Sequence, residues 1–337
     1  MTNMNERLIN ALKGDEVDKK PAVSVTQTAI VELMDLTGAE WPDAHSDPEK
    51  MATLSMASHE QGSLEAVRNP FCLTVLAEAL GCQVNMGTKN RQPSITEHPY
   101  PKDISDLKMP DDLFSTGRIP AVFESSRIIK NKYGEEVPLI SGLEGPATLA
   151  SDLVSPKSFM KWSIKKPDNF DTIMDFATDA CIEYANGLVD NGADVICVAD
   201  PVASPDLMSP KDFDTRIKPR LQRFADEVKA PTVLHICGNV TPIIDMMADT
   251  GFDGLSLEEK VKDLKGAKEK VGDRATIVGN VSSPFTILSG TPDKVKEDAK
   301  KAMDDGVDVL APGCGIAPNS PLANVKALVE ARDEYYS

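Results

Sequence analysis

Residues 232–257, TVLHICGNVTPIIDMMADTGFDGLSL, contain a complete strand–helix–strand unit. The apolar, β-branched run at 232–236 predicts a buried strand, and a second strand is predicted at 253–257 after a segment with helical spacing. Gly251 lies between this helix and the second strand, where glycine supplies the left-handed turn that ends a helix. Such a unit predicts two parallel strands joined by a right-handed crossover.

The same pattern recurs along the chain, with helix endings NGAD before residue 194 and DDGVD before residue 307. Eight strands are predicted, at 22–26, 64–68, 138–141, 194–199, 232–236, 253–257, 275–279 and 307–310. Eight such units predict an α/β fold of the closed (β/α)8 TIM barrel type, with its site at the carboxyl ends of the strands. An open doubly wound sheet is the alternative, which is disfavoured because no GxGxxG loop follows any expected strand.

We expect residues 1–337 to form a single barrel domain with an N-terminal helical extension. The segment at about 81–120 is polar, rich in proline and poorly periodic, and it predicts a lid-like insertion.

The composition limits the possible partners. The chain has 337 residues, of which 41% are hydrophobic and 26% charged, and a formal net charge of −17. An acidic surface of this kind repels phosphate backbones and anionic lipid, so neither nucleic acid nor membrane is an expected partner. No stretch approaches the roughly 18 apolar residues of a membrane span, and the acidic start lacks the apolar core of a signal peptide. We therefore expect a cytoplasmic protein.

The sequence has six cysteines, without a CxxC pair, which argues against a disulfide framework. Those at 72, 82, 181 and 197 are expected to be structural thiols. Cys237 is different, because it lies two residues after His235 at the end of an expected strand, so both side chains point to one face. Cys314, between two glycines, follows the last expected strand.

One imidazole and two thiolates form a ligand set that suits Zn²⁺, and three protein ligands leave a position open for chemistry. Glu258, directly after the strand at 253–257, is a candidate fourth ligand at rest, although an acid there also suits the start of a helix. The alternative is a buried histidine beside inert core cysteines. The strands that carry His235 and Cys314 are not neighbours, so the Cys314 loop must fold over the barrel mouth.

The motifs HICGN (235–239) and APGCGIAP (311–318) on eight such units resemble the zinc-dependent corrinoid:coenzyme M methyltransferases of methanogenic archaea, in the uroporphyrinogen decarboxylase superfamily. The resemblance extends over essentially the whole chain and is closer to the methanol branch than to the methylamine branch. It is carried further by the segments PAVSVTQTAIVELMD (21–35), MGTKNRQPSITEHPYPKD (86–103), LVSPKSFMKWSIKK (153–166) and ADPVASPDLMSP (199–210).

This resemblance implies transfer of a methyl group from a methylated corrinoid protein to the thiol of coenzyme M, giving methyl-coenzyme M. It implies Zn²⁺ on His235, Cys237 and Cys314, and a sulfonate site for which Lys89, Arg91 and the amides near Gly238 are candidates. Four further residues near expected strand ends are candidates for the pocket wall: Gln27, Glu144, Asp200 and Asn280.

Three alternatives remain open. A decarboxylase of the same superfamily would require arginines near the first strand, where the sequence is SVTQTAI. A corrinoid-binding module would use His45 in DAHSDP, but proline replaces the glycine of the cobalt-ligand motif, so we expect His45 in a surface loop. If the zinc site were purely structural, the protein would unfold when the metal is removed.

Overall fold

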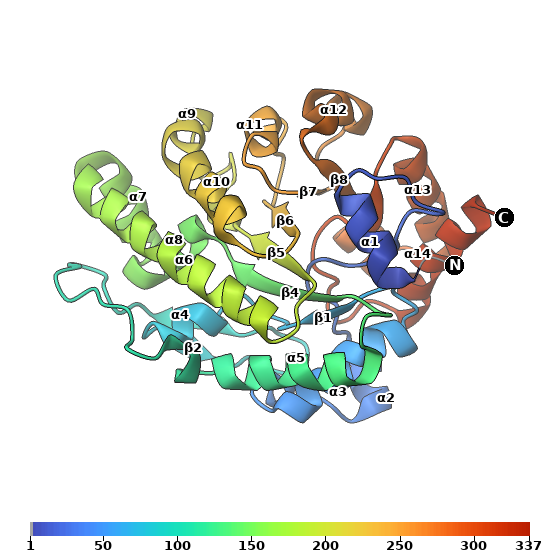
Figure 1. Ribbon diagram of the computed structural model, residues 1–337, viewed down its shortest axis with the longest axis horizontal. Helices are drawn as coiled ribbons and strands as arrows, with labels where there is room; N and C mark the ends of the chain where they lie inside the picture. The colour runs from blue at the N-terminus through green and yellow to red at the C-terminus, as the bar shows by residue number, and fades with distance from the viewer. Residues whose placement is uncertain (1–2) are drawn as a thin grey trace.

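The computed structural model describes residues 3–337 and consists of a curved parallel sheet with helices around its outside (Figure 1). The sheet has seven strands in the order β1-β4-β5-β6-β7-β8-β9, and every neighbouring pair is parallel. Its strands are β1 (Val67–Asn69), β4 (Leu139–Glu144), β5 (Val195–Ala199), β6 (Thr232–His235), β7 (Gly254–Leu257), β8 (Thr276–Val281) and β9 (Val309–Pro312).

The helices alternate with the strands, as the sequence predicts. They are α1 (Met4–Leu12), α2 (Val31–Thr37), α3 (Pro48–Glu60), α4 (Val75–Ala79), α5 (Ile119–Tyr133), α6 (Pro146–Val154), α7 (Pro156–Lys165), α8 (Pro167–Asp190), α9 (Pro210–Asp212), α10 (Lys218–Glu227), α11 (Ile244–Ala248), α12 (Leu264–Val271), α13 (Pro292–Asp304) and α14 (Leu322–Tyr335). The predicted barrel-type α/β fold is confirmed.

The expected first strand, 22–26, is reduced to a single bridge between Ala22 and Leu310 of β9. The backbone around Ala22 nevertheless joins the two edges of the sheet. Val23 N–H donates to Leu310 O at 3.0 Å, and Glu65 N–H, just before β1, donates to Ala22 O at 2.9 Å. The chain then leaves the sheet, because Gln27 O accepts a hydrogen bond from Ile316 N–H at 2.9 Å instead of one from a strand. The prediction of a full strand here was wrong.

The other strands occur where they were predicted, with shifted ends. The strand predicted at 64–68 is confined to Val67–Asn69, and the one predicted at 138–141 extends to Glu144. Pro138 has no N–H to donate to the sheet, and β4 begins directly after it.

The barrel interior follows the two-residue period of the strands. Even-numbered residues of β1 and β4 and odd-numbered residues of β5 and β6 point inward, and Ile140, Val195, Cys197 and Val233 form a separate buried cluster. Leu8, Ala11 and Leu12 of α1 belong to the same cluster, so the predicted N-terminal helix closes the amino end of the barrel.

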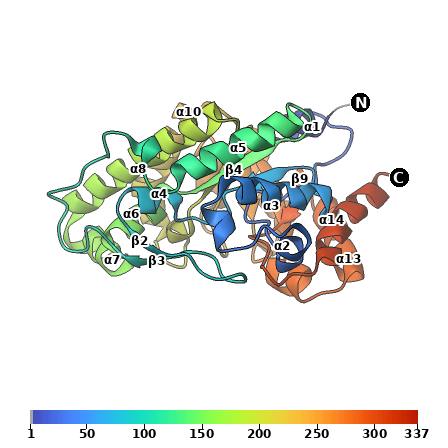
Figure 2. The ribbon, with the colours of Figure 1, turned by 90° about the horizontal axis from the view of Figure 1, so that it is seen from below.

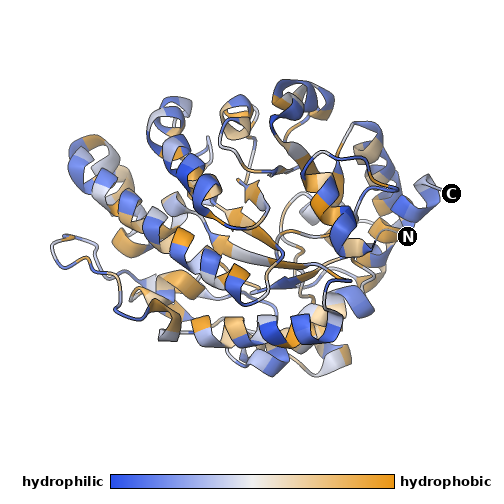
Figure 3. Ribbon diagram, viewed as in Figure 1, coloured by the Kyte–Doolittle hydropathy of each residue, from blue (hydrophilic) through white to orange (hydrophobic). Residues whose placement is uncertain are grey.

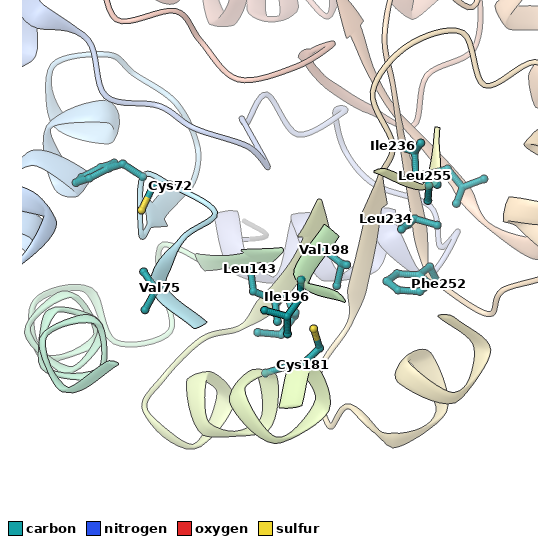
Figure 4. Packing of buried hydrophobic residues seen from close by; sticks show 14 of the residues in the cluster. Cys72, Val75, Leu143, Cys181, Ile196, Val198, Leu234, Ile236, Phe252 and Leu255 are labelled. Atoms are coloured by element: carbon teal, nitrogen blue, oxygen red, sulfur yellow. The ribbon is translucent and has the colours of Figure 1, made fainter. Parts of the chain in front are cut away.

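The opposite faces of the strands pack against the helices. Figure 4 shows Leu143, Ile196, Val198 and Leu234 in this layer, with Cys181 of α8 beside them. The outer faces of the helices are mostly hydrophilic (Figure 3). Among residues 3–337, no helix has the length and apolarity that crossing a membrane would require.

The segment predicted as an insertion contains a small antiparallel hairpin, β2 (Gln83–Asn85) and β3 (Ser94–Glu97), which the sequence did not predict. Figure 2 shows this hairpin apart from the main sheet, near α6 and α7. The prediction for His45 was wrong, because its ring is fully buried, 4.7 Å from the ring of Trp41 and 6.0 Å from that of Phe71.

Candidate metal centre

His235 and Cys237 come from the end of β6. Val233, two residues earlier, is part of the buried interior cluster, so the alternation of the strand directs His235 inward and brings Cys237 to the same side. The strand end is held in place by its neighbour, since Asp200 N–H donates to His235 O at 2.9 Å. The predicted shared face of these two side chains is present in the structure.

Cys314 reaches this pair through a close contact between two loops. A Cβ at Gly313 would lie 3.0 Å from Glu258 Cα, so a larger residue would have to push the loop after β9 away from the end of β7. Ser283 then holds the backbone of Cys314, donating from its hydroxyl to Cys314 O at 2.8 Å and accepting from Cys314 N–H at 3.2 Å. The loop therefore folds inward although its strand is not a neighbour of β6.

The donor atoms of His235, Cys237, Glu258 and Cys314 all lie within 4.8 Å of one another. His235 Nε2 is 3.3 Å from Cys237 Sγ, whereas its Nδ1 is 3.1 Å from Ser256 Oγ. Nε2 therefore points toward the other donor atoms. The serine hydroxyl fixes the orientation of the ring, as hydrogen-bond partners of histidine ligands do in metal sites. The four side chains fit the donor set that a divalent cation such as Zn²⁺ takes.

Glu258 is buried, and its Oε2 lies 3.1 Å from Lys260 Nζ. Its other oxygen is therefore free of this ion pair, and the carboxylate belongs to the donor group rather than to a solvent-exposed helix start. The segment that follows is not helical until α12 begins at Leu264, which removes the alternative explanation that the acid serves a helix N-terminus.

The two thiols affect each other strongly. A hydrogen bond from Cys237 lowers the pKa of the Cys314 thiol, and the same bond, together with burial, raises the pKa of Cys237. Burial opposes the charged form of His235, but its hydrogen bond with the Cys314 thiolate raises the pKa of the imidazole. The lowered pKa of Cys314 favours its thiolate, the form in which a cysteine binds a cation.

A cavity of ≈ 450 Å³ opens beside these donors. His235, Cys237 and Cys314 form one part of its wall, and Ala199 and Pro201 follow from the end of β5. The remaining wall comes from the segment after Ala22, from β1 and its loop, from the insertion and from the loop after Cys314: Thr26, Gln27, Arg68, Phe71, Cys72, Leu73, Asn90, Arg91, Gln92, Gly315, Ile316, Ala317 and Pro318.

Of the candidate pocket residues, Gln27 and Arg91 line this cavity. Gln27 is already engaged, because its side chain bonds to Ile316 O and Ala29 N–H. Lys89 lies near the surface, 2.6 Å from carboxylate oxygens of both Asp35 and Glu40.

The other three candidates have different surroundings. Glu144 accepts a hydrogen bond from Ala77 N–H in α4 at 2.9 Å, and burial raises its pKa to about 7. Asp200 accepts from Thr148 N–H at 2.7 Å at the start of α6, and burial raises its pKa. Asn280 lines a different cavity, beside Glu259 and Lys294.

Three residues of this region were missed in the sequence. Ser256 supports His235, Ser283 holds the Cys314 loop, and Arg68 lines the cavity. Ser256 could have been found, since it lies two residues before Glu258 on the same strand face. Ser283 lies in no expected element and carries no comparable signal. Arg68 had the clearest signal, because a strand predicted at 64–68 and buried on both faces is not expected to contain an arginine.

A parallel barrel with this donor group at its carboxyl end defines the class, a barrel enzyme scaffold with a candidate metal centre. The family model for uroporphyrinogen decarboxylase (URO-D) matches residues 3–335. The methylcobamide:CoM methyltransferase MtaA of Methanosarcina barkeri is 60% identical over 334 residues, which cover 99% of this chain and 98% of that protein.

MtbA of Methanosarcina acetivorans, also a methylcobamide:CoM methyltransferase, is 39% identical, with 98% of this chain and 97% of that protein covered. The solved structure of a methyltransferase from Methanosarcina mazei has 62% identity and a TM-score of 0.99, with 100% of both chains covered. The chain therefore belongs to the uroporphyrinogen decarboxylase family, and within it to the methylcobamide:CoM methyltransferases.

Proposed function

We propose that His235, Cys237 and Cys314 bind one Zn²⁺ per chain. Two thiolates and one imidazole suit this ion, and a three-residue set leaves a coordination position for a substrate. The support is the convergence of the donor atoms to within 4.8 Å of one another, from the ends of β6, β7 and β9. Ligands that come from distant strand ends are typical of catalytic sites, whereas structural zinc sites are usually closed by four ligands in local pairs.

Glu258 is proposed as the fourth ligand at rest. Its carboxylate belongs to the donor group, and Lys260 holds one of its oxygens. Lys260 offers the carboxylate an alternative partner when an incoming substrate takes its place. The displaced charge then stays paired instead of being left alone in a buried position.

The proposed activity is transfer of a methyl group from a methylated corrinoid protein to coenzyme M, giving methyl-coenzyme M. This activity is named for MtaA and MtbA, and full-length identity of 60% to MtaA supports it for this chain. The higher identity to MtaA than to MtbA, at 39%, supports the methanol branch over the methylamine branch. We further propose that the protein acts in the cytoplasm.

When bound, Zn²⁺ would lower the pKa of the substrate thiol from about 8.5 and so present a thiolate at neutral pH. Ser256 orients the imidazole of His235, and the Ser283 clamp holds Cys314 in the wall of the cavity. The apolar side chains of Phe71 and Leu73 in the same wall limit the water around the reacting sulfur.

The chemical step is a displacement at carbon. The substrate thiol loses its proton, its sulfur forms a bond to the methyl carbon, and the electron pair of the cobalt–carbon bond leaves with cobalt as Co(I). The protein contributes position and a deprotonated sulfur, and no side chain of the chain forms a covalent intermediate.

The test uses the purified full chain, free methylcobalamin and coenzyme M under anaerobic conditions. We expect the Co(I) spectrum to appear at a rate that falls on removal of zinc by a chelator and returns when zinc is added. A matched sample treated with chelator should keep its circular dichroism spectrum.

Two results would contradict the proposal. Unfolding on zinc removal would indicate a structural zinc site, and loss of carboxylate from a tetrapyrrole without methyl transfer would indicate a decarboxylase.

A further inference from the structure

Arg68 extends across the interior of the barrel. It shares the inward face of β1 with Ala66, a member of the buried interior cluster. Its guanidinium lies over Gly142 of β4, where a Cβ would overlap Arg68 Nη2. Gly142 is paired in register with Cys197 of β5, and Cys197 with Val233 of β6. The glycine therefore provides the space in which the guanidinium lies over β4, two strands away from β6, which carries His235.

The charge of Arg68 has no counter-charge within residues 3–337. The side chain is 3% exposed, its Nη1 donates to Pro70 O, and its Nε has no hydrogen-bond partner. Burial lowers its pKa, and the groups that act in the opposite direction are the thiols of Cys197 and Cys72 and the hydroxyl of Tyr184. None of these is a carboxylate.

Other buried arginines of the chain are paired. Arg332, at 1% exposure, lies 2.6 Å from Glu65, and Arg118, at 6%, is paired with Glu78 at 2.5 Å. An isolated charge at such depth is costly unless a bound group neutralises it. The unpaired guanidinium of Arg68 therefore indicates a site that binds an anion from outside the chain.

Arg68 and the donor group share one cavity. The wall of the ≈ 450 Å³ space contains Arg68 together with His235, Cys237 and Cys314. Thr26 also lines it and has a buried hydroxyl without a hydrogen-bond partner. A small molecule with a thiol at one end and an oxyanion at the other can satisfy both parts of this wall at once.

We infer that Arg68 binds the anionic end of the substrate thiol, the sulfonate of 2-mercaptoethanesulfonate, and so selects anionic over neutral thiols. This inference rests on the proposed function. The planar guanidinium can donate two parallel hydrogen bonds to an oxyanion, and these charge-assisted bonds are strong in a buried site. Arg91 lines the same cavity from the exposed part of the insertion, where water weakens its charge, and Lys89 already has two carboxylate partners.

The experiment compares two acceptor thiols, 2-mercaptoethanesulfonate and neutral 2-mercaptoethanol, with free methylcobalamin as donor. We expect Arg68→Met to reduce the ratio of their kcat/KM values roughly 10- to 100-fold, mainly through KM for the sulfonate, since hydrogen bonds to charged groups are worth this much. Arg68→Lys, which keeps the charge but loses the planar fork, should give an intermediate ratio. The matched control Arg127→Met, at an exposed arginine of α5 that does not line this cavity, should leave the ratio unchanged.

A second measurement needs neither a thiol nor the metal. Ethanesulfonate should raise the midpoint of thermal unfolding of the wild-type protein and of Arg127→Met, but not that of Arg68→Met. Without ligand, Arg68→Met should unfold at the same temperature as the wild type or higher, because the substitution removes an unpaired buried charge.

An unchanged acceptor ratio and unchanged ethanesulfonate binding in Arg68→Met would overturn the inference while methyl transfer itself persists. If the wild type transfers methyl to neither thiol, the proposed function fails. Ethanesulfonate binding then still decides whether Arg68 is an anion site.

Discussion

The two ends of the barrel both bury charged side chains, but the two ends differ in how completely these charges are paired within residues 3–337. There, Glu65 lies 3.1 Å from Arg7 and 2.6 Å from Arg332, and these arginines also contact Asp18 and Asp333. At the carboxyl end, the donor atoms of His235, Cys237, Glu258 and Cys314 face one another, and Arg68 faces a cavity.

This difference separates stability from function. The amino end is filled by α1 and its charges are neutralised within the chain, so it contributes to folding without any ligand. The carboxyl end concentrates four converging donor side chains and Arg68, which has no counter-charge within residues 3–337. Barrel enzymes show this division in general, with stability at one face and chemistry at the other.

The largest expected effect is loss of metal binding at the carboxyl end without loss of the fold. Cys237→Ala or Cys314→Ala should lower the zinc content from about one per chain to near zero, because one thiolate, one imidazole and the displaceable Glu258 carboxylate do not hold the ion tightly. Metal analysis of the purified variants checks this, and their unfolding in urea should show that the fold persists. Cys181→Ala is the matched control, since this buried thiol donates to Glu144 O far from the donor group. Full zinc content in both ligand variants would remove the metal centre from consideration.

The next effect is a loss of stability at the amino end that leaves the metal site unchanged. Glu65→Gln keeps the size of the side chain but leaves Arg7 and Arg332 without their shared buried anion. We expect a loss of about 3–5 kcal/mol in the free energy of unfolding, because the buried charges that remain lose the carboxylate that neutralises them. Urea denaturation measures this loss. Zinc content and methyl transfer of the folded fraction should be unchanged, and a loss of zinc would contradict the separation of the two ends.

The third prediction is a pH dependence that comes from Glu144, a buried acid of the carboxyl end. Burial raises the pKa of Glu144 from 4.5 to about 7, so between these values the folded protein holds a proton that the unfolded chain releases. Stability from this group is therefore present below about pH 4.5 and is lost as the pH rises toward 7. The free energy of unfolding of Glu144→Gln, relative to that of the wild type, should therefore rise by about 3 kcal/mol as the pH increases from 4.5 to 7.5. Denaturation at several pH values tests the sign, and parallel curves for both proteins would refute it.

The smallest expected effect sharpens the description of the carboxyl end. Ser256→Ala removes the hydroxyl that lies 3.1 Å from His235 Nδ1 and should weaken zinc binding roughly 10- to 100-fold without abolishing it. Competition with a chelator of known affinity measures the change. Ser141→Ala is the control, because this buried hydroxyl donates to Asn69 Oδ1 at 2.9 Å, away from the donor group. Equal zinc affinity in both variants would show that Ser256 does not support the ligand.

Much of the site was predictable because it follows from periodicity. The positions of His235 and Cys237 require only that alternate residues of a strand share a face and that the strand ends at the functional side of the barrel. The strand at 22–26 was predicted by the same logic and was wrong, because side-chain composition does not reveal that Gln27 leaves the sheet to contact the loop at Ile316.

Other parts of the site depend on contacts between distant segments. The candidates Glu144 and Asp200 lie at strand ends, as expected, but their carboxylates bind helix N-termini. Lys89 was proposed for an anion and is paired with Asp35 and Glu40 instead. The hydrogen-bond and ion-pair partners of these side chains depend on which loops lie together in the fold. The hydrophobic periodicity of the sequence does not predict those contacts.

The amino-acid sequence by itself determined the alternating fold, the end of the barrel that carries chemistry, and the candidate donor residues, because these follow from local periods of two and 3.6 residues and from the glycines beside Cys314. Only the tertiary structure decided how the loop of Cys314 reaches the donors of β6, and that Arg68 has no counter-charge within residues 3–337. The first depends on the absence of a side chain at Gly313, which lets a loop approach Glu258, and the second on the space above Gly142. Both are consequences of packing between segments far apart in the chain, where a missing methyl group decides what can approach.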